Sequence, residues 1–459
     1  MSGPSRATKG RLDLLEEAAM RALECASALG LDHAEVSASE GESLEVNVRQ
    51  GAADLVKESR SRGIGMRIVH DGRVATSATT DLGVEAVQAF VASLADMVRF
   101  SEEDPLALPP SPREQTGAWD DLDLYDPKTA RIGPKRAISM ATRAEKAAFK
   151  QDRRITSSEG AGFSRTIGFS VLATSGGFVG RNFGSNQYLV AHVVADDEGG
   201  KKRNGHYWSG GRHFDLIGSP EAVGREAAAR ACRAIGSRKM ATGVYPVVFD
   251  KEAAGTILGL LGSCIMGDRI YREQSYLAAR LKDAVASPLV TVIDDPRIPR
   301  GPGTRPYDAE GRRTRKNKIV TKGVLDGFLL DTYSARKLEM KPTGSAAGGG
   351  GVPHPTSSNF YMKAGRQKPA SLLKGIDKGL YVTNMMGFGF DAMTGNFSRG
   401  AGGLLIESGE LTTPVGEITI SRNLDEILKG IEAVANDLEF RTSVAAPSFR
   451  VDQMTISGN

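Results

Sequence analysis

Disulfide bonds, membrane-spanning segments and secretion signals are all missing from this sequence. Its 459 residues contain only three cysteines, Cys25, Cys232 and Cys264, which are far apart and odd in number, so no disulfide framework is expected. The longest apolar-leaning run, residues 253–266, is broken by glycines and is shorter than the roughly 20 residues that a spanning helix needs. The N-terminus has no apolar stretch of the kind found in signal peptides. These absences predict a soluble protein of the reducing cytoplasm, without a membrane partner.

A strong excess of one charge is missing as well. The 59 Lys and Arg stand against 55 Asp and Glu, which leaves a formal net charge of only +4. Nucleic-acid-binding proteins normally concentrate basic residues on one face, so this balance speaks against a nucleic-acid partner. Aromatic residues make up 6% of the chain, whereas glycine is abundant, with 54 residues. Many glycines favour turns and close backbone approaches, and therefore a chain rich in antiparallel sheet.

In the first half of the chain, hydrophobic periodicity predicts helices alternating with strands. Apolar residues at three- and four-residue steps predict helices over residues 11–29 and 82–98. Alternation of apolar and polar residues predicts strands over residues 34–48 and 63–78. The second strand region is expected to be a hairpin that turns at residues 70–72, a His-Asp-Gly sequence.

Further along, a helix is predicted over residues 134–150, with a proline in its first turn. Residues 154–194 have a strand-like pattern, with turns expected at residues 175–177 and 184–186. A serine N-cap followed by proline predicts another helix over residues 219–236.

A change in composition at Thr242 and Gly243 indicates the boundary between two parts of the chain. Beyond it, a helix is expected to begin at its N-cap, Asn423, and to extend its apolar stripe to Leu438. Short strands are expected over residues 245–249, 289–293, 414–420 and 451–456. The prediction is an α+β fold in two parts, residues 1–241 and 242–459, each a mixed or antiparallel sheet with a few helices. The Pro-rich segment near residues 101–127 is expected to be a solvated linker.

The histidines do not form a zinc-peptidase pattern. Such a helix carries two close histidines with a glutamate beside the first, because neutral imidazoles bind zinc and a carboxylate activates its water. None of the six histidines lies between His213 and His354. His192, His206 and His213 cluster in the sequence, near several acids, and a three-His metal site there is one interpretation. Because residues 204–211 are rich in glycine and the spacing matches no ligand signature, we favour histidines in surface turns.

Three other segments carry weak signals. Residues 387–392 imitate a dinucleotide-binding loop, but glycines interrupt the helix that would have to follow. Residues 344–351 are glycine-rich but lack the Gly-Lys-Ser/Thr ending of a phosphate-binding loop, which favours a mobile or tightly packed loop. Residues 294–318 hold eight Arg or Lys and four acids, and a solvated or interface loop is favoured over a nucleic-acid contact. Cys264 has no nearby histidine in the sequence, which favours a buried structural thiol.

The second half of the chain nevertheless resembles the TldD/PmbA family, and its PmbA branch (also called TldE) most. The resemblance lies in VYPVVFDKEAAGTILGLLGS at residues 244–263, in RPYDAEGRRTRKNKIVTKGVLDGFLLDTYSARKL at residues 305–338, and in GFGFDAMTGNFSRGAGGLLIESGELTTPVGEITISRNL at residues 387–424. The first half, including DGRVATSATTDL at residues 71–82, is similar to the N-terminal region of the same family.

The resemblance implies a metalloprotease assembly in which this chain is the subunit without a metal. In the family, a TldD subunit carries zinc on an H-E-x-x-x-H helix with a later cysteine ligand, and it pairs with TldE to cleave unfolded or flexible peptides. Here Gly259, Leu260 and Cys264 stand where the two histidines and the glutamate would be, and Ala446 or a neighbour replaces the later cysteine. We therefore expect no metal, no cofactor and no catalytic residue on this chain, zinc on a TldD-like partner, and a homodimer as an option for the isolated chain.

The glycine-rich segment after residue 384 is the predicted peptide-binding region. Glycines let a second backbone come close, Met and Phe offer an adaptable apolar lining, and an arginine is able to hold a carboxylate. The candidate substrate-binding residues are Met385, Met386, Gly387, Phe388, Thr394, Asn396, Ser398 and Arg399. A purely structural turn is the alternative interpretation of this segment. For the whole chain, the alternatives are an independent metallohydrolase with a non-standard site and a binding protein of the kind labelled a modulator of DNA gyrase.

Overall fold

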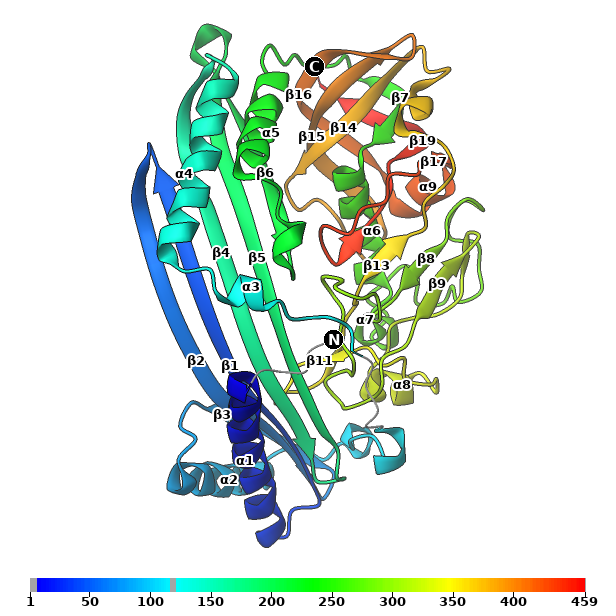
Figure 1. Cartoon of the computed structure of the whole chain (residues 1–459). Helices are drawn as coiled ribbons and strands as arrows, with labels where there is room; N and C mark the ends of the chain where they lie inside the picture. Colours follow the sequence, from blue (N-terminus) through cyan, green and yellow to red (C-terminus); the bar gives the residue numbers. More distant parts are fainter. Residues whose placement is uncertain (1–5, 116–120, 459) are drawn as a thin grey trace.

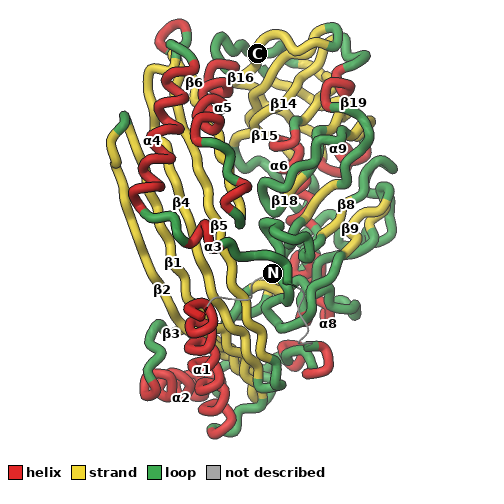
Figure 2. The backbone as a smooth tube through the Cα atoms, in the orientation of Figure 1, coloured by secondary structure: helices red, strands yellow, loops and turns green. Residues whose placement is uncertain are grey.

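The computed structural model describes residues 6–115 and 121–458 and has an α+β fold, as the sequence predicts. A long, curved antiparallel sheet with helices forms the N-terminal side, and a more compact C-terminal part lies beside it (Figures 1 and 2). Over the described residues, every helix is too short or too polar to cross a bilayer.

The N-terminal sheet has six antiparallel strands in the order β3-β2-β1-β4-β5-β6. Their bounds are β1 (His33–Arg49), β2 (Ala52–His70), β3 (Arg73–Thr79), β4 (Ile155–Thr174), β5 (Val179–Asp196) and β6 (Lys202–Gly211). Apolar side chains of one face are buried under two pairs of helices. These are α1 (Arg6–Ala28) with α2 (Val84–Val98) at one end, and α4 (Pro134–Gln151) with α5 (Pro220–Arg233) at the other (Figure 1).

The C-terminal part contains a six-stranded sheet that closes into a small barrel, because β16 pairs with β19 as well as with β15. Its order is β16-β15-β14-β7-β19-β17, and a second sheet has the order β10-β9-β8-β13-β18. The barrel strands are β7 (Gly243–Phe249), β14 (Lys378–Met386), β15 (Asn396–Glu407), β16 (Glu410–Asn423), β17 (Ile431–Val434) and β19 (Phe449–Ser457). The second sheet is formed by β8 (Val292–Asp294), β9 (Asn317–Thr321), β10 (Val324–Leu325), β13 (Phe360–Met362) and β18 (Val444–Ala445).

Helix α6 (Lys251–Cys264) connects the two C-terminal sheets, since it contacts β14 and β7 of the barrel and β13 and β18 of the second sheet. In the described part of the chain, the remaining α-helices and strands are short: α3 (Pro127–Ala130), α7 (Gly267–Tyr271), α8 (Thr332–Lys337), α9 (Leu424–Lys429), β11 (Ala346–Ala347) and β12 (His354–Pro355). The glycine-rich residues 344–351 pack tightly against the N-terminal sheet. A Cβ placed on Gly350 would lie 2.5 Å from the Cα of Gly65, so only glycine allows this approach.

The sequence suggested that the Pro-rich segment near residues 101–127 is a solvated linker, and the structure shows that it is not. Ala107, Leu122 and Leu124 are buried, and Arg67 donates a hydrogen bond to the carbonyl of Ala107. Arg336 of α8 donates to the carbonyl of Leu106 at 2.9 Å. The segment therefore packs between the two parts of the chain, because proline-rich backbone leaves carbonyls free to accept from arginines. Residues 116–120 of the segment lie outside the described residues.

Two predicted turns are wrong because their glycines serve packing. Residues 184–186 lie inside β5, and residues 204–211 belong to β6. A Cβ on Gly205 would come within 2.3 Å of the backbone nitrogen of Ala231 in α5, so this glycine lets the helix lie directly on the strand. A Cβ on Gly210 would lie 2.1 Å from the carbonyl oxygen of Gln187.

The helix expected from Asn423 to Leu438 is also wrong beyond its first turns. Asn423 is the N-cap, with its side chain accepting from the amide of Asp425, but α9 ends at Lys429. Gly430 follows, and residues 431–434 form β17, which pairs with β19 and buries Ile431 and Val434. The apolar residues between 424 and 438 have a spacing that suits one long helix, but they belong to a short helix and a strand with Gly430 between them. The strand expected over residues 289–293 is also shorter and later, at β8.

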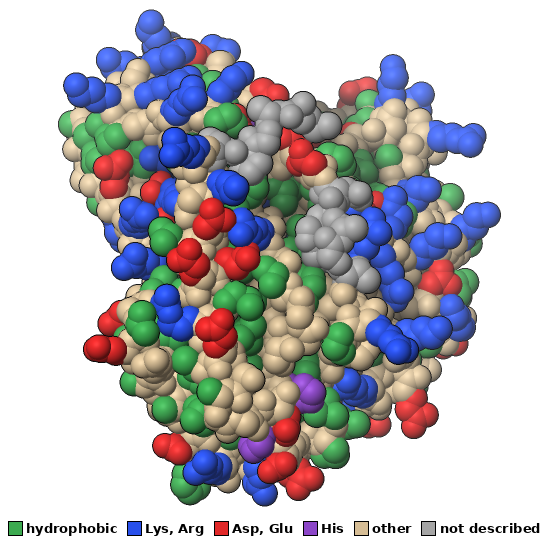
Figure 3. Space-filling view, turned by 60° about the horizontal axis from the view of Figure 1, so that its bottom comes forward, with side chains coloured by type: hydrophobic (Ala, Val, Ile, Leu, Met, Phe, Trp, Pro, Cys, Tyr) green, Lys and Arg blue, Asp and Glu red, His purple; other side chains and the backbone are tan. Residues whose placement is uncertain are grey.

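The basic segment over residues 294–318 is anchored by buried acidic side chains. Asp294, Asp308 and Glu310 are buried, whereas Arg313 and Arg315 are exposed. It is therefore not a solvated loop, although Arg313 and Arg315 reach the surface. Seen from the lower end of the molecule, acidic and basic side chains intermingle to the left of the centre, while Lys and Arg gather at the upper left and along the right side (Figure 3).

Candidate functional site

Helix α6 begins at a buried N-cap and exposes one narrow face. The side chain of Asp250 accepts from the amide of Ala253 at 2.8 Å, and burial raises the pKa of Asp250 to about 6. Ala254, Ile257, Leu258 and Leu261 are completely buried. The opposite face is formed by Glu252, Gly255, Thr256, Gly259 and Ser263, which are exposed or half-buried.

This exposed face forms one wall of a cavity of about 290 Å³. The cavity is lined by Trp208, Lys251, Glu252, Gly255, Thr256, Glu439, Arg441, Thr442, Val444 and Ala445. β18 is an edge strand of its sheet, so the cavity lies between a glycine-bearing helix face and a strand edge. Such an arrangement offers backbone hydrogen-bonding groups to an extended peptide.

The charges around this cavity are paired. Glu252 accepts from Arg230 at 2.7 and 2.9 Å and from Arg441 at 2.5 Å. Burial alone would raise the pKa of Glu252, but the two guanidinium groups lower it, so the carboxylate stays ionised. The Arg441 guanidinium lies 4.5 Å above the ring of Trp208, and Lys251 pairs with Glu439. Sequence patterns could not indicate this cluster, because its members are distant in the chain.

Of the three positions that the sequence assigns to a lost metal site, only one faces the cavity side of α6. A Cβ placed on Gly259 would meet only Val444, at 4.0 Å, so the helix has room for a side chain there. Leu260 and Cys264 pack into the hydrophobic core, together with Ala446. Burial raises the pKa of the Cys264 thiol to about 11, which disfavours the thiolate that a metal would need. Gly259 has no side chain, and the side chains of Leu260 and Cys264 are directed into the core and not toward the cavity.

The three-His interpretation is wrong. His192 and His206 lie opposite each other on β5 and β6 with their rings stacked, 5.6 Å between centroids. Burial and the neighbouring His206 lower the pKa of His192. His213 lies beyond the end of β6, where its Nε2 is 3.2 Å from a carboxylate oxygen of Asp123. Beyond His206, β6 continues for five residues to Gly211, which is about 17 Å of extended strand before the chain reaches His213.

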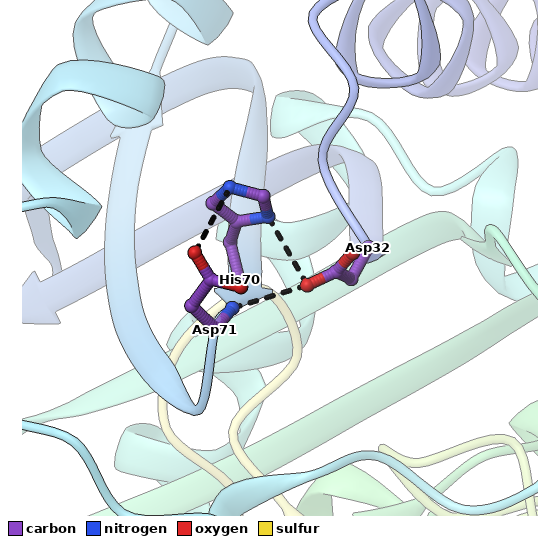
Figure 4. A group of neighbouring side chains, drawn as sticks. All are labelled: Asp32, His70 and Asp71. Atoms are coloured by element: carbon purple, nitrogen blue, oxygen red, sulfur yellow. Dashed lines mark hydrogen bonds and ion pairs between the residues drawn. The ribbon is translucent and has the colours of Figure 1, made fainter.

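Within residues 6–115 and 121–458, one group of three or more metal-ligating side chains lies close together, and sequence reasoning missed it. Asp32, His70 and Asp71 meet where the hairpin between β2 and β3 approaches the turn before β1 (Figure 4). His70 lies between the carboxylates, with Nδ1 3.1 Å from Asp32 and Nε2 3.7 Å from Asp71. Asp32 also accepts a hydrogen bond from the amide of Asp71 at 3.0 Å. This bond lowers the pKa of Asp32 and fixes the hairpin turn. The group is exposed and has no link to α6.

The candidate substrate-binding residues all lie on one hairpin, formed by β14, the intervening loop and β15. Phe388 is 97% exposed and Met386 is 54% exposed, whereas Met385 and Arg399 are half-buried. The loop is held in place by Ala392, whose carbonyl accepts from the amide of Tyr276 at 2.9 Å. The hairpin therefore presents apolar side chains to the outside from a fixed backbone.

The polar candidates separate into two groups on this hairpin. The Asn423 side chain donates to the carbonyl of Thr394 at 2.8 Å and to the Asn396 side chain at 3.2 Å. Asn396 also lines a cavity of about 460 Å³ at the end of the barrel. Ser398 and Arg399 lie further along β15, away from this contact, and the Nε of Arg399 is buried without a hydrogen-bond partner.

Comparisons with known proteins identify a family that shares this architecture. Three family models match consecutive stretches of the chain: PmbA/TldA metallopeptidase domain 1 over residues 34–103, the central domain over residues 127–235, and the C-terminal domain over residues 242–458. The metalloprotease PmbA of Escherichia coli O157:H7 is 34% identical over 97% of this chain and 96% of its own length. The chain belongs to the PmbA/TldD family.

Within the PmbA/TldD family, the similarity is broader to PmbA than to TldD. A TldD homolog of Haemophilus influenzae is 28% identical over 58% of this chain and 60% of its own length. A crystal structure from Bacteroides thetaiotaomicron, named as a candidate modulator of DNA gyrase, is 27% identical and has a TM-score of 0.90, covering 97% of this chain and 99% of its own. The predicted resemblance to the PmbA branch is confirmed.

Proposed function

We propose that this chain is the subunit without a catalytic metal in a TldD/TldE-type metalloprotease, and that it helps to form the peptide path of a zinc-bearing, TldD-like partner. The observation that carries the proposal is the exposed face of α6. Its solvent-facing positions hold glycine, threonine and serine, and its one carboxylate, Glu252, is occupied by two arginines. A glutamate held in this way is a poor general base, because its charge is already neutralised.

The cavity beside α6 supports a role in peptide binding. Gly259 has space above it, and Val444 and Ala445 belong to an edge strand. An extended peptide that adds to such an edge is held by its backbone, which suits substrates of varied sequence. The cavity of a metal-free subunit would then guide a polypeptide that the partner's zinc cleaves.

The hairpin of β14 and β15 supports the second half of the proposal, that this chain helps to form the peptide path. Met386 ends β14 and Phe388 lies in the loop that follows, and both are exposed, so they offer an apolar surface to a partner molecule. Methionine adapts to ligands of different shape because it is flexible and polarisable. We assign this hairpin to the wall of the peptide path, with Arg399 available to a substrate carboxylate.

The test combines the purified chain with a purified TldD-like chain and follows cleavage of an unfolded peptide. Cleavage should require both chains and should stop when a chelator removes zinc from the partner. Cleavage by this chain alone, in a chelator-sensitive way, would contradict the proposal.

A further inference from the structure

Arg399 is a cation without an anionic partner. It lies half-buried on β15 of the hairpin, and its Nε is buried without a hydrogen-bond partner. Among the described residues it forms no ion pair, and its guanidinium carbon lies 5.9 Å above the ring of Phe397. This distance is the outer limit of a cation–π contact, so the ring neutralises little of the charge. A half-buried cation in this state has lost part of its hydration without receiving a counter-charge.

Two acids near this part of the barrel are occupied elsewhere. On the neighbouring strand β16, Arg422 pairs with Asp452. In the loop of the hairpin, Asp391 accepts a hydrogen bond from the hydroxyl of Thr394 at 2.9 Å. The chain therefore supplies a counter-charge to a neighbouring arginine and leaves Arg399 open to an anion from another molecule.

A β-bulge in the hairpin lies across from Arg399. Met386 is paired with Gly400, and the amide of Ser398 donates to the carbonyl of Gly389 at 2.9 Å. Between these two contacts the β14 side has two residues, whereas the β15 side has one, which is Arg399. The extra residue makes a β-bulge, and bulges commonly re-aim side chains next to binding sites.

The bulge is followed by an aromatic side chain that is turned outward. Gly387 has a φ of 83°, a conformation that favours glycine, and Phe388 comes directly after it. Phe388 is 97% exposed and Met386 is 54% exposed, whereas Phe390, two residues further on, packs against the core. The hairpin thus places a cation and two exposed apolar side chains at neighbouring positions.

A peptide carboxylate fits this arrangement. A guanidinium group binds a carboxylate through two parallel hydrogen bonds, and these charge-assisted bonds are stronger than neutral ones. An apolar side chain next to the carboxylate would cover Phe388 and Met386, which removes apolar surface from water. Charge complementarity and apolar burial therefore favour the same kind of ligand.

We propose that Arg399 selects peptide segments in which a carboxylate lies beside an apolar residue, and that Phe388 holds the apolar residue. The inference rests on the proposed role of the hairpin in the peptide path and specifies which peptides that path prefers. Both an acidic side chain and a peptide C-terminus supply such a carboxylate.

Peptide binding tests this selectivity without requiring cleavage. Four unfolded, fluorescent peptides differ at one place: three contain Leu-Glu, Leu-Gln or Leu-Lys and have amidated C-termini, and the fourth ends in Leu with a free carboxylate. In fluorescence anisotropy, the native chain should bind the Leu-Glu peptide about tenfold more tightly than the Leu-Gln peptide, which is the gain expected of hydrogen bonds to a charged group. The Leu-Lys peptide should bind most weakly. Tight binding of the free-carboxylate peptide alone would assign Arg399 to peptide C-termini.

Variants of this chain separate selectivity from a structural role. Arg399→Gln should bind the Leu-Glu and Leu-Gln peptides equally, and Arg399→Glu should bind the Leu-Lys peptide best. Lys378→Glu is the matched control, since Lys378 is an exposed cation at the other end of β14 and its loss should keep the native order. Phe388→Ser should weaken the binding of all peptides by a similar factor and also keep the order. Thermal unfolding of each variant checks that it is folded.

Equal binding of the peptides by the native chain, no binding of any of them, or an unchanged order in Arg399→Glu would overturn the inference. In the two-chain cleavage assay, kcat/KM should follow the same order among the peptides. Ordered binding without cleavage would contradict the proposed function and not the selectivity, whereas equal cleavage of all peptides would contradict the selectivity alone.

Discussion

Glu252 on α6 accepts hydrogen bonds from both terminal nitrogens of Arg230 on α5, at 2.7 and 2.9 Å. These bonds join the helix layer of the N-terminal sheet to the helix beside the candidate peptide cavity. Arg441 donates to the same carboxylate and to the carbonyl of Trp208 on β6. One carboxylate therefore holds three segments that are far apart in the sequence.

Replacing this carboxylate should loosen the junction. Among the described residues, Glu252→Gln removes the one carboxylate that Arg441 contacts and leaves Arg230 with Glu226 alone, and we expect the free energy of unfolding to fall by about 1–3 kcal/mol. Urea denaturation measures this change. Glu221→Gln is the matched control, because Glu221 pairs with Arg143 on the exposed surface and should cost less than about 1 kcal/mol. Equal losses in the two variants would show that the junction is an ordinary surface ion pair.

Stability should depend on pH through a buried glutamate between the two parts. Glu310 is buried and accepts from the amide and hydroxyl of Thr332, and burial together with the nearby charge of Asp308 raises its pKa. Above the ordinary glutamate pKa of about 4.3, the unfolded chain has released a proton that the folded chain still holds. The free energy of unfolding therefore falls as pH rises through this interval.

Glu310→Gln removes this titration while keeping an acceptor for Thr332. Relative to the native chain, the variant should become more stable as pH rises from 5 to 8, by about 1–3 kcal/mol. Urea denaturation at several pH values gives the two slopes. Parallel slopes would mean that Glu310 does not carry the pH dependence.

The exposed aromatic residue on the hairpin of β14 and β15 should matter for function and not for stability. Phe388 is 97% exposed, so Phe388→Ser should change the free energy of unfolding by less than about 0.5 kcal/mol. Peptide cleavage in the presence of a TldD-like chain should fall several-fold, because the apolar lining is reduced. Phe100→Ser is the control, since Phe100 is 89% exposed but lies beyond α2, remote in the sequence from this hairpin. A similar loss of cleavage in both variants would show that the hairpin has no specific role in cleavage.

Cys264 should behave as a structural thiol. It is completely buried and its pKa is raised to about 11, so a variant with Cys25 and Cys232 replaced by serine should not react with a thiol reagent at pH 8 until it is unfolded. A variant that keeps only Cys25, which is half-buried, should react in the native state. Rapid labelling of native Cys264 would show an accessible thiolate and reopen a ligand role for it.

The sequence predicts those features that depend on local patterns. Helices with a clear cap and stripe, such as α4 and α5, begin where their prolines indicate, and the β2–β3 hairpin turns at its His-Asp-Gly sequence. Glycines were harder to interpret, because a glycine that opens a turn and one that lets a helix lie on a strand look identical in sequence. Gly205 belongs to the second kind, and its neighbours were therefore assigned to a turn.

The candidate site depends on long-range contacts, and the sequence indicates only part of it. The positions of Gly259, Leu260 and Cys264 follow from the family resemblance, but their different orientations on α6 appear only when the helix is packed. No common motif joins the residues that meet in the structure. Glu252 pairs with Arg230 and Arg441, and Asp32 pairs with His70.

The zinc content of the isolated chain tests the central claim most directly. The chain is purified without a histidine tag, in its native form and as His70→Ala, which removes the exposed group of Asp32, His70 and Asp71 as a source of surface binding. We predict far less than one zinc ion per chain in both proteins. Zinc near one per chain in both, accompanied by chelator-sensitive peptide cleavage without any partner, would contradict the account.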